Sequence, residues 1–123
     1  MEETIETLTH LVDEYCSVWN EPDIPKRRER LQEFWEPNGR YVDPRSDLEG
    51  VEALVNHIEK IQKSRPGALI QRTSAVDIHH EIGRFHWELR DEDNEKLMEG
   101  LDIVYFTHGE KRIAKIIGFF GVL

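Results

Sequence analysis

The strongest constraint on the fold is a change in the hydrophobic pattern near residue 68. Before this position, apolar residues recur at three- or four-residue steps, and after it they mostly alternate with polar residues. The first pattern is typical of helices with one buried face, and the second is typical of strands. Helices followed by strands indicate an α+β domain, because an α/β fold would alternate the two.

Three helices are expected before residue 68. The first ends before Pro22, the second begins near Pro25 and runs through Trp35, and the third follows Gly50 and ends at Pro66. Their buried stripes comprise Ile5, Leu8, Val12, Tyr15 and Trp19 in the first, Leu31, Phe34 and Trp35 in the second, and Val51, Leu54, Val55, Ile58 and Ile61 in the third.

The strands are joined by short turns, which indicates a mainly antiparallel meander. Asn38-Gly39 is a turn signal, and a short strand at 40–43 ends at Pro44. The later strands are expected over 68–79, 82–90, 96–107 and 112–121. A chain of 123 residues has room for one core, so we expect a single domain over residues 1–123.

The strand at 82–90 divides clearly into two faces. Phe85, Trp87 and Leu89 lie on one side, and charged or polar residues lie on the other. The apolar side is expected to face the space that the helices cover.

The last strand is apolar on both faces. Ile113, Ile117 and Phe119 alternate with Ile116 and Phe120. One face is therefore expected to meet a second copy of the chain, which predicts a homodimer formed through the sheet.

The charge excludes several classes of partner. Sixteen basic residues against 25 acidic ones give a net charge of −9, whereas nucleic acid and anionic membranes attract basic surfaces. The basic run at 26–28 is expected to be a solvated helix face. The first residues lack the features of a signal peptide, and no stretch approaches the roughly 20 apolar residues that span a bilayer. A cytoplasmic protein that binds neither nucleic acid nor membrane is expected.

No cofactor or metal site is expected. His79 and His80 are neighbours on a strand and point to opposite faces, so they cannot share a metal ion. The chain has no cluster with zinc spacing, no phosphate-binding glycine loop and no nucleophile elbow. The single Cys16 excludes an intrachain disulfide and is expected to pack in the core.

Function is expected where a polar residue interrupts an apolar pattern. Asp102 lies within 101–106, a segment that is apolar on both faces. A buried carboxyl without a cationic partner has a raised pKa, and when protonated it donates a hydrogen bond. The alternative is a buried ion pair with Arg72, Arg112 or His57, which would keep the carboxyl ionised.

Three further polar residues each have two interpretations. Tyr15 lies on the buried stripe of the first helix, so its hydroxyl needs either a cavity or a backbone carbonyl. Asp43 precedes Pro44 and is either an acid in a cavity or a turn residue. His57 lies beside the stripe of the third helix and is either structural or part of a pocket.

A set of scattered residues, taken with the order of elements, is similar to a known group. It comprises Tyr15, Trp19-Asn20, Tyr41-Val42-Asp43-Pro44, Gly50, Asp102 and Gly118-Phe119-Phe120-Gly121. The set resembles the SnoaL-like branch of the nuclear transport factor 2-like superfamily over essentially the whole chain. This resemblance implies a cone-shaped α+β barrel, in which three N-terminal helices pack against a curved, mainly antiparallel sheet.

Within that superfamily, the polar positions are most similar to those of ketosteroid isomerase. Tyr15 and Asn20 match a Tyr and Asn near the end of its first helix, Asp43 matches its general base before a Pro, and Asp102 matches its protonated Asp. The resemblance implies that Asp43 moves a proton while Tyr15 and Asp102 hydrogen-bond an enolate oxygen. The segment that joins the first two helices is a few residues longer here. The side chains expected to contact a ligand are Trp19, Trp35, His57, Phe85, Trp87 and Phe120. The three tryptophans and His57 are expected to make the pocket narrower and more polar than a steroid site.

Two functions remain open at this stage. The first is a cofactor-free isomerase or polyketide-cyclase-like enzyme that acts on a small apolar or carbonyl-containing molecule. The second is a non-catalytic homodimeric ligand-binding or interaction module, in which Asp102 is ion-paired and Asp43 only shapes a turn. A dehydratase or hydrolase on the same fold would use His57, His79 or Arg72.

Overall fold

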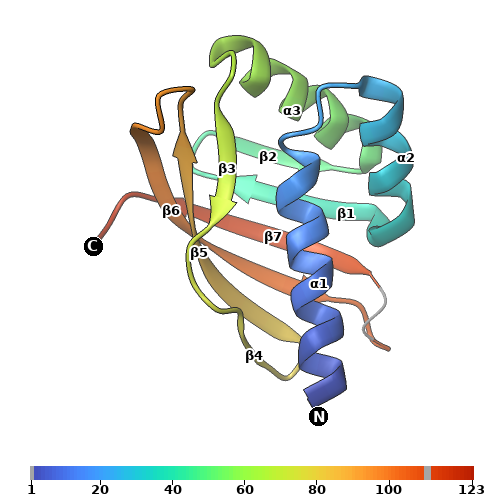
Figure 1. The fold of residues 1–123 in the computed structure, drawn as a ribbon. Coiled ribbons are helices and arrows are strands. Elements are labelled where there is room, and N and C mark those ends of the chain that lie inside the picture. Colours follow the sequence, from blue (N-terminus) through green and yellow to red (C-terminus); the bar gives the residue numbers. More distant parts are fainter. Residues whose placement is uncertain (1, 110–111) are drawn as a thin grey trace.

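The computed structural model describes residues 2–109 and 112–123 and has an α+β fold (Figure 1). In this part of the chain, no helix is both long enough and apolar enough to span a bilayer. The elements in chain order are α1 (Glu2–Val18), α2 (Ile24–Phe34), β1 (Trp35–Asp43), β2 (Ser46–Glu49), α3 (Val51–Ser64), β3 (Leu69–Arg72), β4 (Asp77–His79), β5 (Ile82–Arg90), β6 (Lys96–Phe106) and β7 (Ile113–Phe120).

The strands form one curved, mostly antiparallel sheet, as expected. The strand order is β2-β1-β7-β6-β5-β3, and β4 pairs with β5. Only the β1–β7 pair is parallel among the described strands. The three helices lie on one side of this sheet, with α1 crossing its strands (Figure 1).

The predicted end of the second helix and the predicted turn after it are wrong. The helix ends at Phe34, and Trp35 already begins β1, which continues through Asn38-Gly39. The pairing of β1 with β7 is irregular between Trp35 and Arg40. A Cβ atom on Gly39 would lie 2.5 Å from Nε1 of Trp35, so the missing side chain lets the indole lie against the strand.

The expected strand at 68–79 is split into β3 and β4, and the short β2 was not anticipated. At the break, Thr73 N donates to the His86 carbonyl oxygen, and His86 N donates to Ser74 Oγ. The backbone of β5 therefore keeps its hydrogen-bond partners across the break, which explains why residues 68–79 have the pattern of a single strand.

The two faces of β5 are confirmed, but those of β7 differ in one position. Phe85, Trp87 and Leu89 are buried beneath the helices. Ile113 was expected to share a face with Phe119, yet Ile113 is fully buried and Phe119 is 52% exposed. The β6–β7 register shifts after Ile113, and this irregularity turns its side chain into the core.

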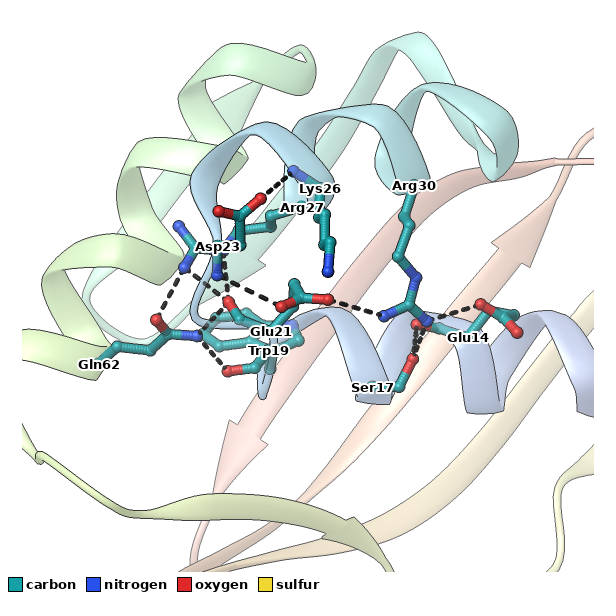
Figure 2. A network of polar contacts seen from close by, with 9 residues as sticks. All are labelled: Glu14, Ser17, Trp19, Glu21, Asp23, Lys26, Arg27, Arg30 and Gln62. Atoms are coloured by element: carbon teal, nitrogen blue, oxygen red, sulfur yellow. Dashed lines mark hydrogen bonds and ion pairs between the residues drawn. The ribbon is translucent and has the colours of Figure 1, made fainter.

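A buried arginine fixes the segment that joins the first two helices (Figure 2). Arg27 was expected on a solvated face, but it is fully buried and donates to the carbonyl oxygen of Glu21 and to Gln62 Oε1, each over 2.7 Å. Gln62, on α3, donates in turn to the carbonyl oxygens of Trp19 and Glu21. These bonds offset the cost of burying the charge and anchor the end of α1 to α3.

A side-chain amide joins the end of α1 to the sheet. Asn20 Nδ2 donates to the Ile70 carbonyl oxygen over 2.9 Å, and its Oδ1 accepts from Ile70 N over 2.7 Å. Asn20 therefore pairs with β3 as another strand would, and it holds α1 across the open side of the sheet.

Candidate active site

A cavity of about 370 Å³ lies between the helices and the sheet. Its size is near the lower end of the range for small-molecule sites, so it suits a compact ligand. The apolar part of its wall is formed by Trp19, Ile61, Ile70, Leu89, Met98 and Phe120.

The three polar residues that interrupt the apolar patterns all line this cavity. Tyr15 comes from α1, Asp43 from the end of β1, and Asp102 from the middle of β6. Residues that are distant in sequence are thus brought to one space.

Four of the six expected ligand contacts also line the cavity, namely Trp19, His57, Trp87 and Phe120. Trp35 and Phe85 lie behind its wall. Trp35 stacks on the ring of Tyr15 with a centroid separation of 5.9 Å, and Phe85 is the cross-strand neighbour of Asp102. Both support the site from behind, because the bulge in β1 and the register of β5 turn them into the core.

Asp102 is buried, and it binds an indole instead of a cation. Trp87 Nε1 donates to its Oδ1 over 2.8 Å. Burial raises the pKa of Asp102 to about 7, the hydrogen bond from Trp87 lowers it, and the Asp43 carboxylate raises it further. A large share of the Asp102 carboxyl is therefore protonated at neutral pH, and its other oxygen can donate into the cavity.

The ion pairs considered for Asp102 do not form among the described residues. Arg72 pairs with Asp13 over 2.7 Å. Arg112 donates to the carbonyl oxygens of Gln32 and Trp35, which leaves it remote from the cavity.

Two glycines shape the surroundings of the carboxyl. Gly100 faces Trp87 across β5 and β6, and a Cβ atom there would lie 2.4 Å from the indole ring. A Cβ atom on Gly118 would lie 3.0 Å from Asp102 Oδ1 and 3.6 Å from Asp43 Cβ. The missing side chains let the indole lie across β6 and let both carboxyl groups approach β7.

Asp43 is both a turn residue and an acid that lines the cavity, the two interpretations left open by the sequence. Its Oδ1 accepts from Arg45 N over 2.8 Å, which shapes the turn, while its side chain faces the cavity. Its Oδ2 accepts from the Tyr41 hydroxyl over 2.7 Å. Tyr41 also lines the cavity, a site role that the sequence does not predict, although two residues of separation on one strand place it on the same face as Asp43.

His57 is a pocket residue. Its Nε2 lies 3.8 Å from Asp43 Oδ2, and this buried atom has no hydrogen-bond partner in the described part of the chain. Burial lowers the pKa of His57, although Asp43 raises it in part. The imidazole is therefore mainly neutral at pH 7 and has an atom to offer to a ligand.

Tyr15 is held by two tryptophans. Its ring stacks on Trp35 and meets the edge of Trp19. Burial raises its pKa well above 10, and the Asp102 carboxylate adds to this effect. The raised pKa keeps the hydroxyl protonated, and no backbone carbonyl within residues 2–109 and 112–123 accepts from it, so Tyr15 has a hydroxyl to donate to a ligand of the cavity that it lines.

Other chemistry has little support in this cavity. Burial raises the pKa of the Cys16 thiol to about 12, so it is not a thiolate nucleophile. Over the described residues, no group of three His, Cys, Asp or Glu side chains could hold a metal ion. The remaining arrangement is a carboxylate close to two weakly acidic hydrogen-bond donors, which suits proton transfer at carbon beside a forming oxyanion.

Known proteins share this architecture. The sequence matches no protein-family model and no curated protein. Among solved structures, it is similar to a candidate isomerase of the SnoaL-like family from Agrobacterium tumefaciens, with 30% identity and a TM-score of 0.89 over 95% of this chain and 99% of that chain.

More distant structures share the fold alone. A candidate polyketide cyclase from Sinorhizobium meliloti has 13% identity and a TM-score of 0.69 over 89% of this chain and 93% of that chain. An NTF2-like protein of unknown function from an Exiguobacterium species has 12% identity and a TM-score of 0.71 over 92% and 99%. On the strength of the Agrobacterium protein, which matches over nearly its whole length, this chain belongs to the SnoaL-like family.

Proposed function

We propose that the protein is an enzyme that moves a proton next to a carbonyl group, as an isomerase or a polyketide-cyclase-like catalyst. One observation carries the proposal: Asp102 is a buried acid with a pKa of about 7 that lines the same cavity as Tyr15 and Asp43. A carboxyl that stays protonated near neutral pH is an uncommon and costly feature, and such groups cluster at functional sites.

In this mechanism Asp43 takes a proton from the carbon next to the carbonyl. The electron pair of the broken C–H bond forms a C=C bond, and the carbonyl oxygen becomes an enolate oxygen. Tyr15 and protonated Asp102 donate hydrogen bonds to that oxygen. For an isomerisation, Asp43 then returns the proton to another carbon. For a cyclisation, the enolate carbon bonds to the carbon of a second carbonyl, whose π electrons move to its oxygen, and Asp43 gives the proton to that alkoxide.

The expected contributions are of familiar size. An oxyanion donor that is already oriented in a site with little water lowers the barrier by on the order of 3 kcal/mol. A positioned base adds roughly 10²–10⁴ in rate. The candidate isomerase and the candidate polyketide cyclase among the similar structures are compatible with this reaction class.

A planar phenol tests the donors, because its oxygen mimics an enolate. We expect 2-naphthol to raise the melting temperature of the wild type, and we expect Asp102→Leu and Tyr15→Phe to lose most of this shift. Met98→Leu changes another cavity residue and is the matched control, since it should keep the shift. An equal shift in all four proteins would contradict the assigned donors.

A non-catalytic ligand-binding module is the second candidate. The observation that favours it is the engagement of both Asp43 oxygens, by Arg45 N and by the Tyr41 hydroxyl. Exchange of the acidic C–H protons of 2-tetralone in D₂O, followed by NMR, separates the two. An enzyme accelerates this exchange and loses the effect in Asp43→Asn, whereas a binding module leaves the exchange at the solvent rate.

A further inference from the structure

The arginines of this acidic chain fall into two groups. In the described structure, six pair with carboxylates, as Arg28 does with Glu52, and Arg27 and Arg112 donate to carbonyl oxygens. The guanidinium groups of Arg45 and Arg65 make no hydrogen bond or ion pair with the described residues. The chain has 25 acidic residues, so carboxylates are abundant, and these two guanidinium groups nevertheless pair with none of the described ones.

These two arginines line the same cavity. Arg45 lies in the turn between β1 and β2, and Arg65 caps the end of α3, yet both line the cavity of the candidate active site. Both arginines are solvent-exposed. Ser46 follows Arg45 and Ser64 precedes Arg65 in the chain, and both serines also line the cavity. The cavity mouth therefore has two cations and two hydroxyl groups.

The cavity is consequently divided by charge. Its mouth carries Arg45 and Arg65, whereas the buried carboxyl groups of Asp43 and Asp102 lie inside. The Asp43 carboxylate disfavours a ligand carboxylate at the inner end, whereas the two guanidinium groups attract one to the mouth. A guanidinium binds a carboxylate through two parallel hydrogen bonds, which also fixes the orientation of its ligand.

We propose that the ligand of this cavity is an anion, with a carboxylate held at the mouth by Arg45 and Arg65 and a carbonyl or enolate oxygen at the inner end. This inference rests on the proposed function, because it names the substrate class of the same site. An apolar body of one or two rings fits the wall between the two ends.

Each arginine also has a simpler explanation. A cation at the end of α3 interacts favourably with the helix dipole, and Arg45 is free to be solvated in its turn. These explanations require no ligand, and they predict no preference for an anionic compound over a neutral one.

Two matched compounds distinguish the alternatives, namely 2-naphthol and 6-hydroxy-2-naphthoate, which differ by one carboxylate. Their dissociation constants are measured by calorimetry near pH 6, where Asp102 is mainly protonated. We expect the wild type to bind the naphthoate about fivefold more tightly, since pairs of exposed charges contribute modestly. The preference should fall as salt is raised from about 0.05 to about 0.5 M.

The double variant Arg45→Gln/Arg65→Gln should bind both compounds within about twofold of one another. Its control is Arg28→Gln/Arg40→Gln, which changes the net charge equally at exposed ion pairs outside the cavity and should keep the preference. No preference in the wild type, or an unchanged preference in the first variant, overturns the inference.

The inference and the proposed function fail in different ways. If the wild type binds both compounds equally well and Asp102→Leu weakens that binding, only the anionic substrate class is overturned. A preference that requires the arginines, together with unchanged binding in Asp102→Leu and Tyr15→Phe, overturns the oxyanion donors only. Binding of neither compound overturns both.

Discussion

Trp87 Nε1 donates a hydrogen bond to Asp102 Oδ1 over 2.8 Å, and this is the only side-chain hydrogen bond of Asp102 within the described structure. The bond stabilises the charged carboxylate, whereas burial stabilises the neutral acid, and the balance gives a pKa of about 7. The carboxyl is therefore held where a small change in either influence alters its protonation at neutral pH.

The first prediction concerns Trp87→Phe. Removal of the indole N–H removes the contact that lowers the pKa of Asp102, so its carboxyl should stay protonated to higher pH. We expect the affinity of the wild type for 2-naphthol to fall as pH rises through about 7, and this fall should move to higher pH in the variant. Binding curves over a pH series measure it, with Met98→Leu as the control that keeps the wild-type profile. A fall at the same pH in all three proteins would show that Asp102 is not the titrating group.

The second prediction concerns the stability of Asp102→Asn. The folded pKa of about 7 exceeds the ordinary value of 3.8, so between these values the folded state binds more protons than the unfolded state. The free energy of unfolding of the wild type should therefore fall as pH rises from about 4 to about 7, by at most about 4 kcal/mol. Asparagine can still accept from Trp87 but does not ionise. Urea denaturation at pH 5 and pH 8 should show the variant gaining on the wild type at pH 8, and a difference that is independent of pH would contradict the raised pKa.

The sequence predicts a secondary-structure element correctly where one local pattern decides its structure. Strict alternation in 82–90 places β5 and its buried face correctly. An acid inside an apolar strand is sufficient to single out Asp102, because no local arrangement takes its side chain to water. The candidate active site is predicted in the same way, from polar residues that interrupt apolar patterns.

What the sequence could not supply depends on contacts between distant residues. Arg27 reads as part of a charged surface, and only the carbonyl of Glu21 and the amide of Gln62 make its burial possible. The contact of Trp87 with Asp102 requires the register of β5 on β6 and the absence of a side chain at Gly100. No local pattern encodes such relationships.

The third prediction concerns Gly118→Ala. The added methyl group would lie 3.0 Å from Asp102 Oδ1, which is tighter than an ordinary contact, so the carboxyl must move. We expect a stability loss of roughly 1–3 kcal/mol and a weaker affinity for 2-naphthol. Thermal denaturation and calorimetry measure the two effects. Unchanged naphthol affinity in a folded variant would mean that the position of Asp102 does not matter for the ligand.

The fourth prediction concerns the outer face of the sheet. Phe119 is 52% exposed on β7, where it is the cross-strand neighbour of Leu101. We expect this face to form a homodimer, because Phe119, Val122 and Leu123 line one hollow on it and are exposed, so that a second copy would bury them. Light scattering after size exclusion should give a dimer for the wild type and a monomer for Phe119→Glu. Ile24→Glu introduces the same charge on the distant α2, where Ile24 is 37% exposed, and it should remain dimeric. A monomeric wild type refutes the prediction.

The last prediction links His57 to the proposed base. Burial lowers the pKa of His57, and the Asp43 carboxylate, 3.8 Å away, raises it in part. Asp43→Asn removes that favourable charge, so the variant should lower the pKa of His57 further below 6.5. An NMR titration of the imidazole protons reads this change directly, and the other five histidines serve as internal references.

The pairing of His57 with Asp43 also affects how the free energy of unfolding changes at acidic pH. Since the folded pKa of His57 lies below its unfolded value, the unfolded state binds more protons as pH falls through about 6.5, and the folded state loses stability. His57→Gln should remove this loss, and Asp43→Asn should enlarge it. If instead the His57 resonances titrate identically with and without the Asp43 carboxylate, the two side chains are not coupled, and His57 does not influence the proposed base.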